Sequence, residues 1–415
     1  MNRLTPVQTG ERIETLDVLR GFALLGILAM NIRAMAGPFG AYMYPYALFD
    51  YVGANRSAYV FTSVVFDLKM MGLFSMLFGA GVLLYAGKSR EGVSPRGLWF
   101  RRMFWLLVIG LVHSYLIWNG DILVPYALCG LLLLWWMRRL RPAYLLAAAI
   151  AVLSVGGLLT FGHGIAWESM SEAERAEEIA IMTPSREQAL AQVERMQRGY
   201  LEVVRSRAAF VLMGQTFFFG MFFFWRCGGM MLLGMSLYKY GFLDGSRADR
   251  VYIKTAAICI PIGLALAWFG VYELERAGFL MPQRAAADLW NYAGSVLASV
   301  GYAALLILLV NHRLLGGLRA ALAAVGQMAL SNYLLHSVLS SVIFLGWGLG
   351  LAGRWDYAEQ LVYVVAVWAF QLAVSPIWLR HFRFGPAEWV WRSLTYWQRQ
   401  PLRRDTPQRP ALARA

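Results

Sequence analysis

His113 and Asp121 are the two titratable residues whose types and spacing point most directly to chemistry. They lie in GLVHSYLIWNGDIL, residues 110–123, where one apolar segment ends in a polar turn, Asn119-Gly120-Asp121, and another begins. Because the turn is short, the two flanking helices must be neighbours, and the two side chains can converge. A carboxylate beside an imidazole fixes its tautomer and raises its basicity, as a general base requires. A buried, satisfied histidine and an aspartate that caps the next helix explain the same residues.

The composition indicates that these residues lie in a membrane. Of 415 residues, 59% are hydrophobic and only 15% are charged, far fewer charges than a soluble protein of this length carries. The apolar residues gather into runs long enough to span the hydrocarbon core as helices. These runs cover residues 16–35, 58–87, 102–118, 122–137, 143–162, 208–238, 251–272, 290–311, 320–347 and 357–379. The sequence therefore predicts an all-α fold, a polytopic helical membrane protein with about ten transmembrane helices.

Positively charged residues predict the orientation of the chain. Lysine and arginine gather near the N-terminus, at alternate joins between the runs and in the C-terminal tail. The short loops on the other side hold only Arg56, Arg276, Arg284 and Arg354. Since basic loops stay in the cytoplasm, both termini are expected there. The formal net charge of +14 is spread over these loops rather than along one stripe, so we expect no nucleic-acid partner.

Hydropathy divides the chain into four parts. They are the helices of residues 1–162, an exterior segment at 163–207, the helices of 208–379 and a cytoplasmic tail at 380–415. The exterior segment is rich in helix formers and predicts two helices separated by Pro184. These helices form either a solvated charged face or a lid over the mouth of the bundle. In the tail, the tryptophans and arginines of 382–397 predict an amphipathic segment that anchors to the membrane.

Polar residues inside the apolar runs are further candidates for function, because charges at membrane depth are costly. Asp17 and Arg20 are spaced i, i+3 and can pair on one face of the first helix. Arg226 has mostly apolar neighbours in the chain, so its guanidinium requires a carboxylate, carbonyls or an anionic ligand. Asp67 and Lys69 are too close in sequence to share a helix face, so separate partners are expected for them.

Three uncharged or weakly basic side chains complete the set of candidates: Asn31, Asn332 and His336. Asn31 marks the exterior end of the first helix. Hydrogen bonding between helices is the alternative role of Asn332 and His336. The cysteines fall inside apolar runs and show no metal-ligand spacing, so no metal site is expected.

Six motifs carry a family resemblance. They are LDVLRGFALLGILAMNI (16–32), FSMLFGAGVLL (74–84), GLVHSYLIWNGDILVPYALCGLL (110–132), MMLLGMSLYKYGF (230–242), GQMALSNYLLHS (326–337) and FRFGPAEWVWRSLTY (382–396). Together they resemble the YeiB family, a group of bacterial inner-membrane proteins whose C-terminal half is a domain of unknown function. The resemblance implies a location in the bacterial inner membrane. His336 departs from the family pattern, which often has glutamine there, and this argues against an essential imidazole.

The opening of the chain also resembles a broader superfamily of transmembrane acyltransferases, which includes the acyltransferase-3 proteins and the lysosomal heparan N-acetyltransferase. Those enzymes move an acyl group from cytoplasmic acyl-CoA to a sugar on the other side of the membrane. The residues that carry this resemblance are Leu16, Asp17, Leu19, Arg20 and Gly21.

Three functions are therefore open. In an acyltransferase, Arg101 and Arg102 would attract the phosphates of an acyl-CoA-like donor. His113, oriented by Asp121, would deprotonate an exterior acceptor, either a sugar or a lipid-linked molecule, while Arg20 or Arg226 anchored the donor. In a transporter or channel, the same residues would form a proton relay or a substrate site, although no inverted repeat is evident. In a scaffold protein, the buried charges would only specify packing.

Overall fold

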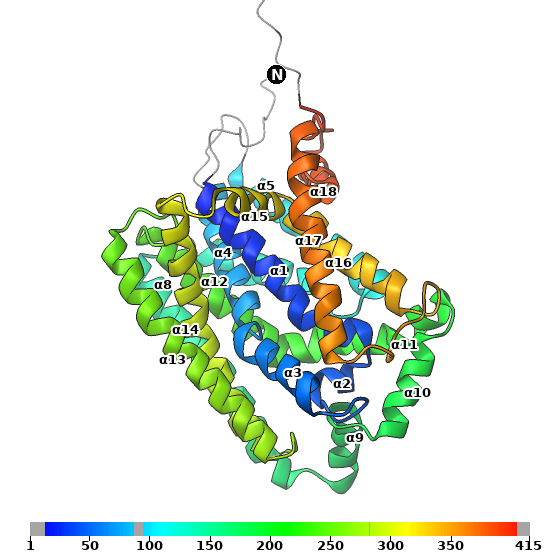
Figure 1. Cartoon of the computed structure of the whole chain (residues 1–415). Helices are drawn as coiled ribbons and strands as arrows, with labels where there is room; N and C mark the ends of the chain where they lie inside the picture. The colour runs from blue at the N-terminus through cyan, green and yellow to red at the C-terminus, as the bar shows by residue number, and fades with distance from the viewer. Residues whose placement is uncertain (1–12, 87–93, 282, 405–415) are drawn as a thin grey trace, which may run out of the picture.

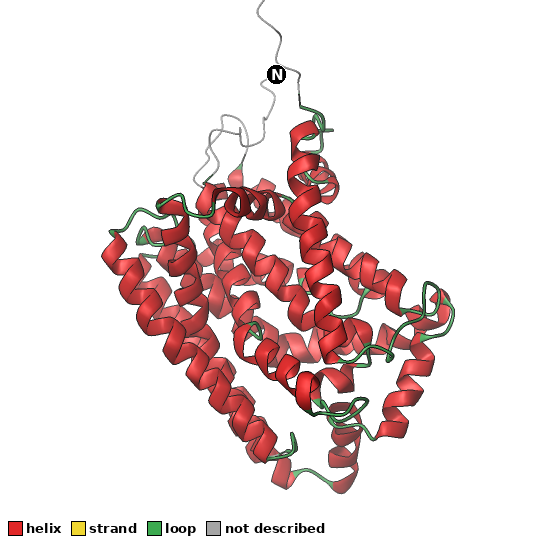
Figure 2. Ribbon diagram, viewed as in Figure 1, coloured by secondary structure: helices red, strands yellow, loops and turns green. Residues whose placement is uncertain are grey.

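The computed structural model describes residues 13–86, 94–281 and 283–404, and helices make up most of this part of the chain (Figure 2). The only β-type pairing within those ranges is one isolated bridge, between Phe382 and Arg403. The predicted all-α fold is confirmed.

Eight helical segments in the described ranges are long and apolar enough to cross a membrane. They are α1 (Glu14–Ala36), α3 with α4 (Gly53–Tyr85), α5 with the π-helix η2 (Pro95–Ile117), α8 (Pro142–Ala166), α11 to α12 (Tyr200–Lys239), α13 (Asp249–Arg276), α14 (Gln283–Asn311) and α17 (Tyr357–His381). Two shorter apolar segments, Leu123–Met137 and Ala329–Phe344, correspond to the remaining predicted runs. The protein is a polytopic helical membrane protein.

The ninth predicted run, 320–347, is two helices rather than one. It divides at Met328 into α15 (Gly316–Gln327) and α16 (Ala329–Phe344), and α15 lies across one end of the bundle (Figure 1). A carboxylate from the tail explains the division, because Glu388 accepts hydrogen bonds from the backbone N–H groups of Leu330 (2.6 Å) and Ser331 (3.1 Å). These groups belong to the first turn of α16, where no intrahelical acceptor exists.

The first helix, α1, lies at the centre of the bundle (Figure 1), and 78% of its most apolar window is buried. It crosses α15 in backbone contact. A Cβ at Gly21 would overlap the carbonyl oxygen of Leu322, and one at Gly326 would overlap that of Asp17. The glycine of the opening LDVLRG motif therefore serves the packing of α1 against α15.

Both ends of the described chain lie at the same end of the bundle, as an even number of crossings requires (Figure 1). At the other end lie α9 (Glu172–Met182) and α10 (Arg186–Met196), the two helices predicted on either side of Pro184. Each begins with a capping box, at Ser171 and Ser185 respectively. A third helix, α11 (Tyr200–Met213), continues directly into the membrane-spanning segment that ends at Lys239.

The amphipathic segment predicted in the tail is helix α18 (Pro386–Tyr396), which packs on the start of α5 (Pro95–Val112). The indole N–H of Trp391 donates to the carbonyl of Arg102 at 2.9 Å, and the Arg102 guanidinium lies 3.7 Å from the centre of the Trp391 ring. Arg101 donates to the carbonyl of Thr395 at 3.3 Å. Both arginines are thus engaged with the tail.

Candidate functional site

Three buried side chains form a hydrogen-bonded row: Asp121, His113 and Ser337. The Nδ1 atom of His113 is 2.7 Å from Oδ1 of Asp121, and its Nε2 atom is 2.9 Å from Oγ of Ser337. His113 and Ser337 are 1% and 0% exposed, and the Asp121 side chain is 2% exposed. His113 and Asp121 therefore converge as the short turn between their helices predicts, and a serine completes the row.

Asp121 has two hydrogen-bond partners. One fits its predicted role beside the imidazole, and the other fits its predicted role as a cap of the next helix. Its Oδ1 atom meets the imidazole, while Oδ2 accepts a hydrogen bond from the backbone N–H of Val124 at 2.7 Å, at the start of α6 (Leu123–Cys129). A carboxylate can only accept, so the Nδ1 atom of His113 carries the proton in this contact. The Nε2 atom is then the acceptor, and the Ser337 hydroxyl donates to it.

The row is built from elements far apart in sequence. His113 opens η2 (His113–Ile117), and π-helices of this kind frequently occur at functional sites. Ser337 lies in the middle of α16, one turn after Tyr333, whose ring centre is 5.2 Å from that of His113. The Tyr333 hydroxyl accepts a hydrogen bond from the backbone N–H of Ile122 at 3.2 Å. The tyrosine thus joins α16 to the turn that carries Asp121.

Helix α11 holds the other end of η2. Arg207 donates to the carbonyls of Tyr115 (3.1 Å) and Ile117 (2.8 Å), and the Tyr200 hydroxyl donates to that of Leu116 (2.9 Å). Carbonyls at the end of a helix lack intrahelical partners, so these bonds close η2. The segment that begins with His113 is therefore held between the bundle and helix α11.

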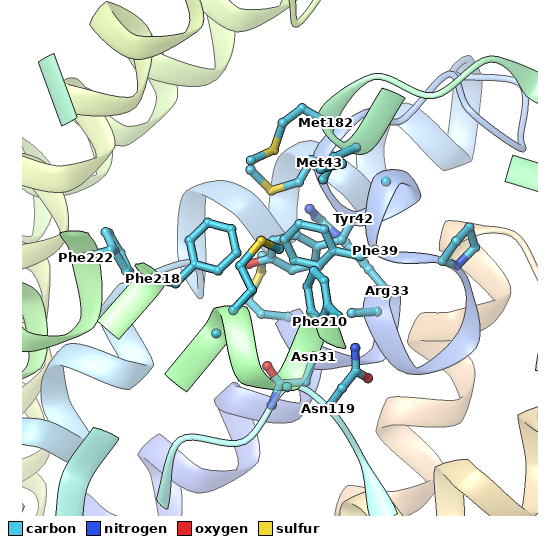
Figure 3. Close-up of a pocket in the computed structure, with 18 of the residues that line it drawn as sticks. Asn31, Arg33, Phe39, Tyr42, Met43, Asn119, Met182, Phe210, Phe218 and Phe222 are labelled. Atoms are coloured by element: carbon cyan, nitrogen blue, oxygen red, sulfur yellow. The ribbon is translucent and has the colours of Figure 1, made fainter. Parts of the chain in front are cut away.

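A cavity with a volume of about 1560 Å³ lies beside the row. Figure 3 shows some of the residues that line this cavity. Asp121, Ser114 and Ser340 line it, whereas His113 and Ser337 are not among its lining residues in the described part of the chain. Residues of α9, α10 and α11 line the cavity as well, including Glu178 and Arg195. Helices α9, α10 and α11 therefore cover the cavity, and they also carry exposed charged residues.

Arg33, in the last turn of α1, is a cavity residue that was not among the predicted site residues. It is 4% exposed and donates to the Tyr59 carbonyl (2.7 Å), the Thr62 hydroxyl and the Ser63 hydroxyl (3.2 Å). Its guanidinium lies 3.8 Å from the centre of the Tyr59 ring. The predicted residue Asn31 also lines the cavity, near Asn119 in Figure 3. The signal in the sequence was an arginine within an apolar run, two residues after Asn31.

Asp67 and Lys69 share one partner, so the prediction of separate partners is wrong. Asn291 of α14 accepts from the Lys69 ammonium and donates to Asp67 at 2.8 Å. Leu68 has a positive φ of 57°, and this residue breaks the second run between α3 (Gly53–Val65) and α4 (Lys69–Ala86). The break turns both side chains to the same neighbour, which a continuous helix would not do.

The hydroxyl of Tyr42 donates to the same carboxylate, Asp67, at 3.5 Å. Tyr42 belongs to the short helix α2 (Phe39–Met43), outside the membrane-spanning segments. Burial first, and then the negative charge of Asp67, raise the pKa of this hydroxyl well above its usual value. Tyr42 therefore stays protonated and remains a donor at the edge of the cavity.

Three further predicted residues serve contacts between helices. Arg226 is fully buried and donates to the Tyr292 carbonyl (3.0 Å) and the Ser295 hydroxyl, so carbonyl and hydroxyl oxygens supply the partners that its charge requires. Asn332 donates to the Val325 carbonyl at 3.2 Å and to Ser375 at 3.1 Å. His336 lies 2.8 Å from the side-chain oxygen of Gln371 on α17. Adjacent in sequence, His336 and Ser337 thus have partners on different helices.

The structure does not bring Asp17, Arg20, Arg101 and Arg102 to this cavity. Asp17 and Arg20 pair with each other at 2.7 Å, at the opposite end of α1 from the cavity. The lining residues of α1 begin at Ile27, because the earlier turns pack against α15. In the described chain, no group of three or more histidine, cysteine or acidic side chains could hold a metal ion.

The chain is similar to known proteins along most of its length. Residues 237–398 match a family described as "Protein of unknown function (DUF418)". The chain is 32% identical over 399 residues to "Uncharacterized protein YeiB" of Escherichia coli (strain K12), which covers 93% of this chain and 96% of that protein. It is 29% identical to "Uncharacterized protein YxaH" of Bacillus subtilis (strain 168), over 98% of this chain and all of the relative. The protein, with the predicted motifs in order along nearly its whole length, belongs to the YeiB family.

Proposed function

We propose that this protein is an acyltransferase of the bacterial inner membrane that moves an acyl group from a cytoplasmic, acyl-CoA-like donor to an acceptor on the exterior side. One observation carries the proposal: the hydrogen-bonded row Asp121–His113–Ser337 beside a large cavity. A carboxylate, an imidazole and a hydroxyl in this order are the parts of a general base that activates a nucleophile. The donor class and the direction of transfer rest on the resemblance to transmembrane acyltransferases and on the predicted orientation.

The first step uses Ser337 as the nucleophile. Its Oγ atom attacks the carbonyl carbon of the donor thioester while the Nε2 atom of His113 takes the hydroxyl proton. The bond between carbon and sulfur then breaks, and the imidazolium returns the proton to the leaving thiolate. Asp121 stabilises the imidazolium and takes no proton itself. The products of this step are a free thiol and an ester on Ser337.

The second step regenerates the serine. An acceptor hydroxyl attacks the ester carbonyl, His113 takes its proton, and the proton passes to Oγ as the bond to Ser337 breaks. Two steps fit the row better than direct transfer, because Ser337 occupies the Nε2 atom that the acceptor would otherwise use. Ser337 also lies eight residues into α16, about 12 Å from its start, so an ester there would hold the acyl group between the two membrane faces.

The test is covalent labelling of the protein purified in detergent with a fluorophosphonate, which reacts with activated serines and needs no knowledge of the substrate. We expect labelling at Ser337 in the wild type and its loss in Ser337→Ala and His113→Ala. The matched control is His336→Gln, which changes the adjacent histidine and has its partner on another helix. Labelling that persists in Ser337→Ala, or no labelling of a folded wild type, would contradict the proposal.

A transfer assay completes the test. Membrane vesicles that contain the protein are supplied with radiolabelled acetyl-CoA on the cytoplasmic face, and acid-stable label is measured on the protein and in the extracted envelope material. Label should accumulate on Ser337 when acceptor is withheld. If label reaches the envelope equally well in His113→Ala, the assignment of the base is wrong.

A second function, proton-coupled transport, is favoured by a different observation. The Asp67–Asn291–Lys69 chain places a partly buried carboxylate and a buried lysine beside the cavity, as in proton relays of carriers. In proteoliposomes, a carrier would give substrate-dependent proton uptake that Asp67→Asn abolishes and Ser337→Ala preserves. The acyltransferase should show no such uptake.

A further inference from the structure

The cavity beside the row has two chemically different sides. One side is aromatic and comes mainly from α11 and the π-helix η5 (Gly214–Phe223). Its ring contacts run from Phe39 to Phe210 (5.0 Å between centroids) and from Phe210 to Phe218 (6.4 Å). Figure 3 places Phe218 and Phe222 on a different side of the pocket from Asn31 and Asn119. The polar side also includes Asp121, so it adjoins the hydrogen-bonded row.

The aromatic side separates the cavity from the region of the membrane. The segment Tyr200–Lys239 has only 6% of its most apolar window buried, against 78% for α1, so the other helices enclose little of it. Leu212 is 56% exposed and is not a lining residue, while Phe218 and Phe222 line the cavity from the same continuous helical segment. The segment Tyr200–Lys239 therefore has an outer face that is available to lipid and an inner face that lines the cavity.

The dimensions fit a large apolar ligand. A volume of about 1560 Å³ exceeds the roughly 300–1000 Å³ of ordinary small-molecule sites. The segment Tyr200–Lys239 has 40 residues and is about 60 Å long, twice the roughly 30 Å thickness of the hydrocarbon core. Its aromatic part, η5, lies in the middle of this length, far from both ends of the segment.

We propose that the cavity binds a membrane lipid, with its apolar chains against the phenylalanines of η5 and its polar head, which bears a hydroxyl, beside Asn31, Asn119 and Asp121. The inference rests on the proposed function only in making this hydroxyl the acyl acceptor; the binding of the lipid stands on the cavity alone. A lipid enters from the membrane, so a purely water-soluble acceptor is not required.

The chain offers a matched pair of glycines for the test. Gly214 lines the cavity, and a Cβ added there meets no atom within 4 Å, so a larger side chain can enter the empty space. Gly220 lies on the same π-helix, is also free of neighbours within 4 Å, and is not one of the lining residues. Gly214→Phe therefore fills the cavity, whereas Gly220→Phe makes the same chemical change outside it.

The experiment uses the full-length protein in nanodiscs of phosphatidylcholine that contain phosphatidylglycerol with a photoreactive diazirine in its acyl chain. After illumination, mass spectrometry maps the crosslinks. We expect crosslinks at the inward residues Phe218 and Phe222, reduced about tenfold in Gly214→Phe, equivalent to about 1.4 kcal/mol of binding free energy. Gly220→Phe should match the wild type.

Crosslinks confined to outward residues such as Leu212 and Thr216, or equal inward crosslinking in both glycine variants, would overturn the inference. The fluorophosphonate experiment separates this result from the proposed function. Labelling of Ser337 without inward crosslinks would support the proposed acyltransferase and refute the binding of a lipid in the cavity. Inward crosslinks without labelling of Ser337 would support the binding of a lipid in the cavity and refute the proposed acyltransferase.

Discussion

Replacing Asp121 by Asn tests whether the row is catalytic or only structural. The carboxylate receives hydrogen bonds from His113 and from Val124 N, both at 2.7 Å. Asn caps a helix about as well as Asp, so the bond to Val124 survives. A hydrogen bond to a charged group contributes about 1.5–3 kcal/mol and a neutral one about 0.5–1.5 kcal/mol. The free energy of unfolding should therefore fall by about 1–1.5 kcal/mol.

The effect on reactivity should be much larger. The side-chain amide of Asn can donate to the Nδ1 atom of His113, which moves the ring proton to Nε2. The imidazole then donates to Ser337 and cannot accept its proton. The corresponding change in a serine protease lowers kcat by about 10⁴. We expect the rate of fluorophosphonate labelling at Ser337 to fall by about 10³ to 10⁴, still less than the loss in His113→Ala.

Rates are measured with the detergent-solubilised protein at temperatures where each variant remains folded, and thermal melting reports stability in the same detergent. Asp50→Asn, an exposed site, is the control for loss of a carboxylate. If Asp121→Asn loses stability as expected but labels at the wild-type rate, the row is a packing feature and the reasoning is refuted.

Three further outcomes follow from the structure. Gly21→Ala should lower the free energy of unfolding by about 1–3 kcal/mol in detergent melts, because its Cβ overlaps α15, whereas Gly81→Ala, with open space at its Cβ, should be neutral or stabilising. Burial raises the pKa of Glu388 above its ordinary value of 4.5, so its contribution to stability is fully present below that value and is lost as the pH rises through the raised pKa. In the wild type the melting temperature should therefore fall as the pH rises above 4.5, and this fall should be absent in Glu388→Gln. If the variant shows the same fall, another titrating group causes it. A cysteine placed within 175–200 should react with an impermeant reagent outside intact cells, and one after Arg399 should not; the reverse pattern would invert the orientation.

The sequence predicted the parts of the site that are joined by a short turn. His113 and Asp121 are eight residues apart, so local geometry alone brought them together. Ser337 is 224 residues from His113, and its role depends on how α16 packs against η2, which no local pattern specifies. The local signal for Ser337 was its position beside His336 in the motif GQMALSNYLLHS, and the histidine was taken as the candidate instead of the serine.

The positions of the ten apolar runs were predictable for a similar reason, since hydropathy depends on the segment alone. The breaks within them were not. The division at Met328 depends on Glu388, a tail residue far along the chain, and that at Leu68 depends on a left-handed backbone in a bulky residue. The shared partner of Asp67 and Lys69 follows from the second break. Tertiary contacts, which hydropathy does not record, decided each of these cases.

The long separation between His113 and Ser337 also has a consequence for biosynthesis. Ribosomes add about 5–20 residues per second, so the 224 residues between them take about 10 to 45 seconds to emerge. During this time His113 and Asp121 have already been synthesised, while the Nε2 atom of His113 still lacks its partner Ser337. Water or a passing polar group must satisfy it until α16 inserts. His113 and Ser337, the proposed base and nucleophile, therefore meet only after most of the protein has been made, so the nascent chain lacks the complete row until then.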